Sequence, residues 1–369
     1  MLAFCGIDAL AAQSVSAQHD VLIFVNGEKL IGQVVEATAK EVTFKSEMAG
    51  KVTAKWDKIK ELRYGESAAV VKKGVKLHWG EPFPNVPQGT VTAANGQVQV
   101  RPAPSAPPIS VPVSNLQNLV TSEEFERAMH EHPSFFSDWK GAATAGASLV
   151  VATQNERTYT SNISLVRAMP LESWLNPIRR TKVTFNSAYG ILTQPGQPSV
   201  ETSILHGEAQ HDEYFTPSLF GFGDAAFDHN FAQGLDLQQT YGGGVGWTAI
   251  KSDSEELDVK GAMTYMRQQF QTAQANQNLI GSTFSESFSG KFVHGLTLQQ
   301  DVAFLPAWNN TNAYSAVANI AVTLPLYKRF GITVGILDNF LNNPPPGFRK
   351  NSFTFTTGAT YTIGPVAGQ

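Results

Sequence analysis

The chain has 369 residues, of which 16% are charged, and its formal net charge is -4. This length allows two domains or one large barrel with an appendage, and the slight negative charge gives no reason to expect a nucleic-acid partner. No run approaches 18 consecutive apolar residues, which excludes a transmembrane helix but not a membrane-spanning β-barrel.

Residues 1–17 are predicted to be a signal peptide. The stretch is mostly small or apolar and ends in Val15-Ser16-Ala17, which is similar to an A-x-A cleavage site. No Lys or Arg precedes the apolar part, so the start of this signal peptide is either misplaced or trimmed. Phe4-Cys5 resembles a lipoprotein box only loosely. Cleavage after Ala17 removes Cys5, the only cysteine, and excludes disulfide and thiol chemistry in the mature chain.

Residues 18–66 are predicted to form a small β-barrel module of the SH3 or Sm-like kind. Val21, Ile23 and Val25 alternate with other residues, and Asn26-Gly27 is a strong hairpin turn. Short strands with similar spacing follow this turn as far as Leu62, which is typical of a five-stranded barrel.

Residues 67–120 are predicted to be a degenerate second copy of this module. The segment at Gly89 matches the one at Gly32, and the segment at Val98 matches the one at Val42, with an offset of about 57 residues. Several prolines interrupt the copy and its linker, which predicts a loose or partly extended unit. The prolines within the copy are Pro102, Pro104, Pro107 and Pro108.

Residues 121–138 are predicted to be a short helix and linker. Thr121-Ser122-Glu123-Glu124 is a candidate capping box, and Phe125 and Met129 lie on one face of the helix that it would begin. The helix is either a plain linker, or an interfacial anchor or plug at a barrel mouth.

Residues 139–364 are predicted to form an antiparallel up-and-down transmembrane β-barrel of about 12 strands. The chain is therefore all-β apart from the linker helix. In the last segment Phe353, Phe355 and Tyr361 fall on one face, while hydroxyl side chains fall on the other. The even strand count suits a single-chain bacterial barrel. The predicted strands lie near 140–153, 157–169, 181–193, 200–213, 218–231, 235–250, 255–269, 281–294, 296–308, 313–326, 330–342 and 352–363.

Polar stripes in these strands predict a water-filled or hydrogen-bonded lumen, because polar side chains are costly to bury without partners. The candidate lumen residues are Lys182, His206, Glu208, Gln210, Asp212, Asp224, Asp228, Asp236, Glu256, Asp258, Lys260 and Asp301. They form either a network that fills a narrow barrel or the lining of a weakly cation-preferring pore. Glu286 shares an apolar face with Phe284 and Phe288, which a β-bulge or a position at the rim would explain.

No catalytic, cofactor-binding or metal-binding residue is predicted. His206 with Glu208, and His211 with Asp212, have no third ligand at a recognisable spacing. A lipid hydrolase in the outer membrane would need an outward-facing Ser–His pair oriented by a third polar group, and no spacing in the chain identifies one.

The layout resembles that of a known family, the salt-induced outer-membrane proteins, whose barrel is a domain of unknown function (DUF481). The resemblance rests on Asn-Gly-Glu-Lys-Leu-Ile-Gly-Gln-Val at 26–34, on Lys-Trp-Asp-Lys-Ile-Lys-Glu-Leu at 55–62 and on the C-terminal barrel. It implies an outer-membrane location and no established activity. Residues 356–363 also resemble the signal that barrel assembly machinery recognises, although they end in Ile363 rather than Phe.

The leading hypothesis is a non-enzymatic barrel in the outer membrane of a Gram-negative bacterium, either structural or a narrow pore. Its N-terminal module would lie in the periplasm and contact peptidoglycan or a periplasmic protein. The expected partners also include outer-membrane lipid and the barrel assembly machinery, with no nucleic acid and no cofactor. Two alternatives remain open, an outer-membrane lipid hydrolase and a soluble β-sandwich binding protein. Substitution of His206, His211, His229 or His294 would test the hydrolase.

Overall fold

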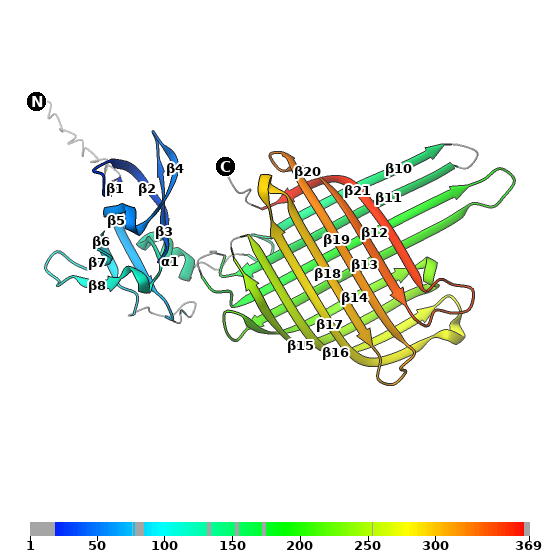
Figure 1. Ribbon diagram of the computed structural model, residues 1–369. Coiled ribbons are helices and arrows are strands. Elements are labelled where there is room, and N and C mark those ends of the chain that lie inside the picture. Colours follow the sequence, from blue (N-terminus) through cyan, green and yellow to red (C-terminus); the bar gives the residue numbers. More distant parts are fainter. Residues whose placement is uncertain are drawn as a thin grey trace, which may run out of the picture. The chain divides into compact units, whose positions relative to one another are not determined.

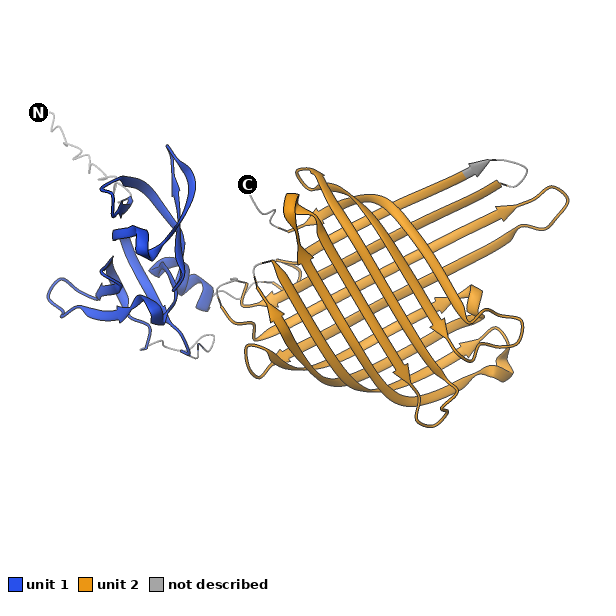
Figure 2. Ribbon diagram, in the orientation of Figure 1, with its two compact units in different colours: residues 1–132 blue, residues 133–369 orange. Residues whose placement is uncertain are grey.

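A computed structural model describes residues 19–75, 77, 85–130, 134–151, 155–171, 175–252 and 254–364. The chain divides into two compact units, residues 1–132 and residues 133–369 (Figure 2). The predicted signal peptide at 1–17 lies outside the described residues. In the described part of the chain, no helix is long and apolar enough to cross a membrane.

Unit 1 contains one nine-stranded antiparallel sheet (Figure 1). Its path is β4-β3-β2-β1-β5-β6-β7-β8, and β9 pairs with β5 away from that path. The strands are β1 (Asp20–Phe24), β2 (Lys29–Ala37), β3 (Glu41–Ser46), β4 (Gly50–Lys55), β5 (Ile59–Lys72), β6 (Gln88–Ala94), β7 (Gln97–Arg101), β8 (Ile109–Pro112) and β9 (Leu116–Thr121). Short 3-10 turns, η1 (Trp56–Lys58) and η2 (Val113–Asn115), precede β5 and β9.

The predicted duplication is visible in this topology. Strands β2, β3 and β4 with η1 repeat as β6, β7 and β8 with η2. The first half of β5 pairs with β1 of the first copy and its second half pairs with β9 of the second copy, while β6 pairs with both halves. The same close contact explains why both equivalent positions hold glycine. A Cβ on Gly32 would lie 2.1 Å from the carbonyl oxygen of Lys45, and a Cβ on Gly89 would lie 2.2 Å from the carbonyl oxygen of Arg101.

The two copies share β5 and one hydrophobic core, so they are not separate modules. The boundary placed at residues 66/67 falls inside β5. Phe44 and Leu62 from the first copy pack in the same fully buried cluster as Val98 and Leu119 from the second. The second copy is therefore not loose, and its prolines at 102–108 are confined to the β7–β8 connection.

The predicted capping box begins a real helix, α1 (Ser122–His130). The Thr121 hydroxyl oxygen accepts a hydrogen bond from the backbone N–H of Glu124 at 3.2 Å, as a helix N-cap does. Phe125 and Met129 are buried, and α1 packs on β5 and β9. An interfacial anchor or a plug would need this apolar face to be free, and unit 1 covers it.

The Asp20 carboxylate accepts hydrogen bonds from backbone N–H groups at two places where strand pairing in the unit 1 sheet shifts. The pairing of β2 shifts near Val34, and the pairing of β5 shifts between Arg63 and Ser67. Asp20, at the start of β1 between these strands, accepts hydrogen bonds from the backbone N–H of Val34 at 2.7 Å and of Gly65 at 2.8 Å. Burial raises the pKa of the Asp20 carboxyl group, and these two donors oppose the shift.

We therefore predict that Asp20→Ala selectively loosens β2 and the middle of β5. Both N–H groups lose a charged acceptor, a loss of about 1–3 kcal/mol for each partly buried group. Hydrogen exchange of the full-length protein, followed by mass spectrometry, should show faster exchange in peptides covering 30–37 and 61–67. Asp20→Asn keeps one acceptor oxygen and should give a smaller effect. Equal exchange in all three proteins would contradict this role of Asp20.

Unit 2 is a closed barrel of twelve antiparallel strands in up-and-down order, as predicted (Figure 1). This closed sheet excludes the alternative of a β-sandwich. The strands are β10 (Lys140–Val151), β11 (Asn155–Met169), β12 (Arg179–Thr193), β13 (Val200–Tyr214), β14 (Leu219–Asn230), β15 (Leu235–Lys251), β16 (Glu255–Phe270), β17 (Gln277–Lys291), β18 (Thr297–Pro306), β19 (Tyr314–Tyr327), β20 (Phe330–Leu341) and β21 (Asn351–Ile363). We call the end where β10 begins and β21 ends the terminal end, and the other end the distal end.

The largest boundary error is in β17, which begins at Gln277 rather than near residue 281. The polar Gln271–Asn278 stretch looks like a loop in the sequence. In the barrel, Gln277 pairs with Gln268 of β16 and donates a side-chain hydrogen bond to its amide oxygen at 2.8 Å. Polar residues are strand residues here because their side chains pair across the ladder.

The outer face of the barrel is apolar and its inner face carries hydroxyl groups. Outward side chains such as Met263, Phe284 and Phe330 are more than half exposed. On the inner face, Thr360 exchanges hydroxyl hydrogen bonds with Thr144 at 2.9 Å and with Thr333 at 2.5 Å. This distribution is the reverse of that in a water-soluble barrel.

Glu286 is an exception on the outer face, and neither predicted explanation applies. The pairing of β17 with β16 and β18 has no register shift, so no bulge inverts its direction. Glu286 also lies five residues before the strand ends at Lys291. Instead, its carboxylate accepts a hydrogen bond from the amide of Gln300 on β18 at 2.9 Å. A neighbouring polar side chain thus satisfies one oxygen of this carboxylate.

Candidate functional site: the lumen of the barrel

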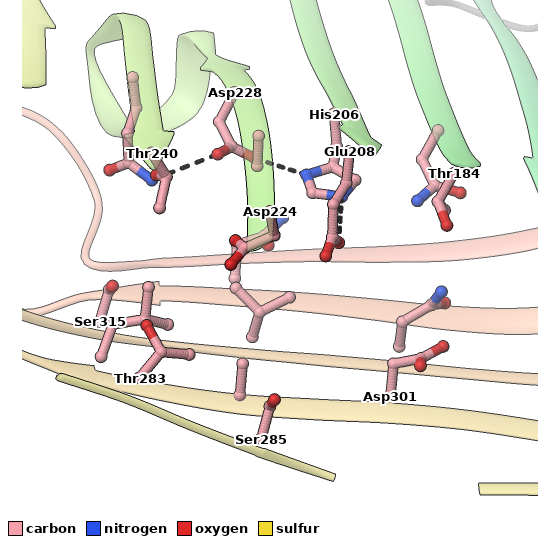
Figure 3. Close-up of a pocket in the computed structure, with 18 of the residues that line it drawn as sticks. Thr184, His206, Glu208, Asp224, Asp228, Thr240, Thr283, Ser285, Asp301 and Ser315 are labelled. Carbon is pink, nitrogen blue, oxygen red and sulfur yellow. Dashed lines mark hydrogen bonds and ion pairs between the residues drawn. The ribbon is translucent and has the colours of Figure 1, made fainter. Parts of the chain in front are cut away.

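The barrel holds a cavity of about 220 Å³, lined by both polar and apolar side chains (Figure 3). The strands β12 to β20 contribute its lining, because every second residue of a strand points inward. Eight of the predicted lumen residues line it: Lys182, His206, Glu208, Gln210, Asp224, Asp228, Lys260 and Asp301. The structure therefore brings together most of the polar stripe that the sequence alternation indicates.

His206 lies between two carboxylates on the cavity wall. Its Nδ1 is 2.7 Å from an oxygen of Asp228, and its Nε2 is 3.6 Å from an oxygen of Glu208 (Figure 3). Asp228 also accepts a hydrogen bond from Gln238 at 3.2 Å. Because both ring nitrogens face carboxylates, neither is free to act as a base toward a substrate. His206 and Glu208 thus form part of the wall of the cavity.

Near its terminal end, the inside of the barrel holds a buried ion-pair cluster, which we call the Arg180 network. Arg180 on β12 contacts Asp212 at 2.7 Å, Asp258 at 2.7 Å and Glu256 at 2.5 Å. Its side chain is only 5% exposed. Lys182 adds a second cation 3.1 Å from Asp258. These charges come from β12, β13 and β16, so the network joins strands that are not all neighbours.

Aromatic rings pack against this network. The Arg180 guanidinium carbon lies 5.5 Å from the ring centre of Tyr214 and 5.1 Å from that of the fully buried Phe220. The two rings also contact each other, with centres 5.0 Å apart. Arginine suits this position because a planar guanidinium can hold several carboxylates while it stacks on rings.

A hydrogen-bonded bridge crosses the barrel at its distal end. Gln233, in the 3-10 turn η3 (Phe231–Gln233) between β14 and β15, is buried. Its amide donates hydrogen bonds to the carbonyl oxygens of Asn339 at 2.8 Å and Lys350 at 2.9 Å. The backbone N–H of Arg349 also donates to the carbonyl oxygen of Ala232 at 3.1 Å. Strands β14 and β15 lie six positions from β20 and β21 in the ring of twelve, so this bridge spans opposite walls.

The remaining predicted lumen residues have different positions. Asp212, Glu256 and Asp258 belong to the Arg180 network. Asp236 is exposed and does not line the cavity. The pairing of its strand shifts between Leu235 and Leu237. This bulge breaks the inward–outward alternation on which the predicted lumen position of Asp236 is based.

Arg180 and Gln233 are two of the inward-facing residues that sequence reasoning missed. Arg180 has the same inward alternation as Lys182, so that signal could have found it. Gln233 could not be found in this way, because it lies in a turn. Within the described part of the chain, no group of three or more His, Cys, Asp or Glu residues is arranged to hold a metal ion.

A closed antiparallel barrel with an apolar exterior and a polar, hydrogen-bonded interior defines a transmembrane β-barrel. The family model described as "Protein of unknown function, DUF481" matches residues 143–363. The chain therefore belongs to this family, as the sequence resemblance predicts. The match covers nearly the whole barrel and leaves unit 1 outside it.

No curated protein matches the chain. Among solved structures, the chain is similar to the translocator domain of autotransporter NalP from Neisseria meningitidis, with 10% identity, a TM-score of 0.31, and coverage of 60% of this chain and 87% of that one. It is also similar to the β domain of the Bordetella autotransporter BrkA, with 9% identity, a TM-score of 0.30, and coverage of 61% and 99%. At identities and TM-scores this low, no function of these proteins can be assigned to this chain.

Proposed function

We propose that this chain is an outer-membrane β-barrel protein whose lumen is a closed, non-catalytic interior and whose barrel anchors unit 1 in the periplasm. The observation that carries the proposal is a set of buried polar contacts across the lumen at both ends, the Arg180 network and the Gln233 bridge. A lumen closed in this way makes a stable anchor and does not pass solutes. An apolar outer face needs lipid around it, which supports the membrane location.

Unit 1 is the contact module of this proposal. It has its own core and its own fold, so it does not depend on the barrel for packing. With both barrel termini at one end, a periplasmic unit 1 requires that the terminal end faces the periplasm. Its partner would be peptidoglycan or a periplasmic protein, and β21 would supply the assembly signal.

A narrow, weakly cation-preferring pore is the second candidate, and the cavity favours it. Glu208, Asp224, Asp228 and Asp301 outnumber Lys182 and Lys260 in the lining. Carboxylates in excess attract cations in a confined lumen. This candidate requires that at least one end opens.

Two experiments test the proposal. Cell fractionation should place the protein in the outer membrane, and its mobility in gels should change on heating, as for a folded barrel. In planar bilayers the wild-type protein should show no steady conductance, while Gln233→Ala should admit brief openings. A steady, cation-selective conductance of the wild type would favour the pore. A fully soluble protein without a heat-dependent mobility shift would contradict both candidates.

A further inference from the structure

A serine and a histidine form a hydrogen-bonded pair at positions that point outward by the alternation of their strands, and the histidine also borders the cavity. The Ser203 hydroxyl oxygen on β13 lies 2.7 Å from Nε2 of His229 on β14. Ser203 is the fourth residue of β13 and His229 is one residue before the end of β14, which places the pair near the distal end. Their neighbours Leu205 and Phe227, which share their alternation, are exposed on the outer face.

A third group orients the imidazole. Nδ1 of His229 lies 2.8 Å from the backbone carbonyl oxygen of Asp236. A carbonyl only accepts hydrogen bonds, so Nδ1 carries the proton and Nε2 presents its lone pair to Ser203. This is the tautomer in which a histidine can take a proton from a serine hydroxyl.

The local backbone explains why this carbonyl is available. The pairing of β14 with β15 shifts between Asp228 and Asn230, and the pairing of β15 with β16 shifts between Leu235 and Leu237. His229 and Asp236 therefore both fall at irregular positions of the ladder. The same bulge that removes Asp236 from the lumen frees its carbonyl oxygen to hold His229.

The surroundings of the pair are mostly apolar, with the Glu201 carboxylate in contact with Tyr189. Tyr189 lies directly opposite Ser203 on β12, Leu205 lies opposite His229, and Phe227 precedes His229 on the same face. These three side chains are 38–45% exposed. They leave a surface on which an acyl chain can lie beside the hydroxyl group of Ser203.

The other histidines with comparable contacts differ in these respects. His206 faces the lumen between two carboxylates. His211 is on the outer face at the terminal end, with Nδ1 2.9 Å from the Thr181 hydroxyl oxygen. Its neighbours are charged, because Glu213 lies 3.4 Å from its Nε2 and also pairs with Arg179. Thr181 and His211 therefore make a matched control for Ser203 and His229.

We propose that Ser203 and His229 are the nucleophile and the general base of an acyl-ester hydrolase that acts on membrane lipids. The Ser203 oxygen attacks the ester carbonyl carbon while Nε2 of His229 takes the hydroxyl proton. The ester C–O bond breaks, and His229 returns the proton to the leaving alcohol. Water then attacks the acyl-serine, His229 takes a proton from it and passes that proton to Ser203, and a fatty acid leaves. This reaction consumes one water molecule and needs no metal ion, oxidant or reductant.

This inference goes beyond the closed lumen, and it rests on the proposed membrane location only for access to its substrate. Two kinds of lipid carry such esters, namely phospholipids and acylated glycolipids. Mixed micelles bring either lipid to the protein whether or not it lies in a membrane in the cell. A failure of the hydrolase in micelles is therefore distinct from a failure of the membrane location.

The test uses the full-length protein folded in detergent micelles that contain a diacyl phospholipid or an acylated lipid A. We expect release of fatty acid, measured by mass spectrometry, from at least one of the two. We also expect covalent labelling of Ser203 by hexadecylsulfonyl fluoride. Ser203→Ala and His229→Ala should each lower the rate at least about 100-fold, the usual minimum effect of losing a nucleophile or its base.

Thr181→Ala and His211→Ala should leave both the rate and the labelling of Ser203 unchanged. The heat-dependent gel mobility of every variant shows whether it is folded. The proposal is overturned if the folded wild type neither releases fatty acid nor is labelled at Ser203. It is also overturned if Ser203→Ala retains the wild-type rate.

Discussion

Replacement of Arg180 by Met should destabilise the folded barrel by about 3–5 kcal/mol, the usual cost of removing one partner from a buried ion pair. The variant leaves Asp212 and Asp258, which are 0% and 1% exposed, without their main cation. Lys182 still contacts Asp258, whereas Arg180 is the only described residue that forms an ion pair with Asp212. Denaturant unfolding in detergent micelles, followed by the heat-dependent gel mobility, measures the change.

A charge-balanced variant separates the charge effect from packing. Asp212→Asn and Asp258→Asn together with Arg180→Met remove the unpaired charges while they keep similar volumes. We expect this triple variant to recover most of the lost stability, because a neutral replacement of a buried ion pair is often nearly neutral. Arg180→Lys should recover less, because a single ammonium group cannot reach three carboxylates from one position. A change below about 1 kcal/mol in Arg180→Met would show that the network does not hold the terminal end.

The barrel could be predicted from the sequence because its faces differ in polarity along every strand. The alternation at Phe353, Phe355 and Tyr361 is local, and it survives in β21. The same alternation places eight lumen residues correctly, since strand geometry sends every second side chain inward. It fails at Asp236, where a bulge adds a residue and reverses the direction. No local pattern in the sequence indicates that bulge.

The contacts across the barrel and the Ser203–His229 pair could not be predicted, because the residues that meet in them lie far apart in the sequence. Gln233 meets Lys350 from 117 positions away, and Arg180 meets Asp258 from 78 positions away, a separation given by their residue numbers. Ser203 and His229 become neighbours only through the register of β13 with β14. Such contacts follow from how the barrel closes, and spacing along the chain does not reveal them.

The N-terminal unit shows a different limit of sequence reasoning. The repeat of Gly32 as Gly89 was recognisable, because both glycines face a backbone carbonyl oxygen. The sharing of β5 was not, because one continuous strand serves two copies that look separate in the sequence. Prolines at 102–108 suggested looseness, but a connection between strands accommodates them without disturbing the core.

Replacement of Gly358 by Ala should impair closure of the barrel between its first and last strands. The β10–β21 seam has a short register, from Gly141 opposite Ile363 to Ala145 opposite Ala359. A Cβ on Gly358 would lie 2.4 Å from the carbonyl oxygen of Ala145 and 3.0 Å from the backbone nitrogen of Gly146. Backbone atoms cannot move aside as a flexible side chain does, so the two strands must separate at this point.

Because a tight site usually loses about 1–3 kcal/mol to an added methyl group, and the short seam has few other contacts, we expect a large drop in the folded fraction. Gly358→Val should be worse. Gly261→Ala is the matched control, because a Cβ at Gly261 meets nothing within 4 Å. The heat-dependent gel shift of protein recovered from membranes measures the folded fraction. If Gly358→Ala folds as well as Gly261→Ala, close approach at the seam is not what requires a glycine at this position.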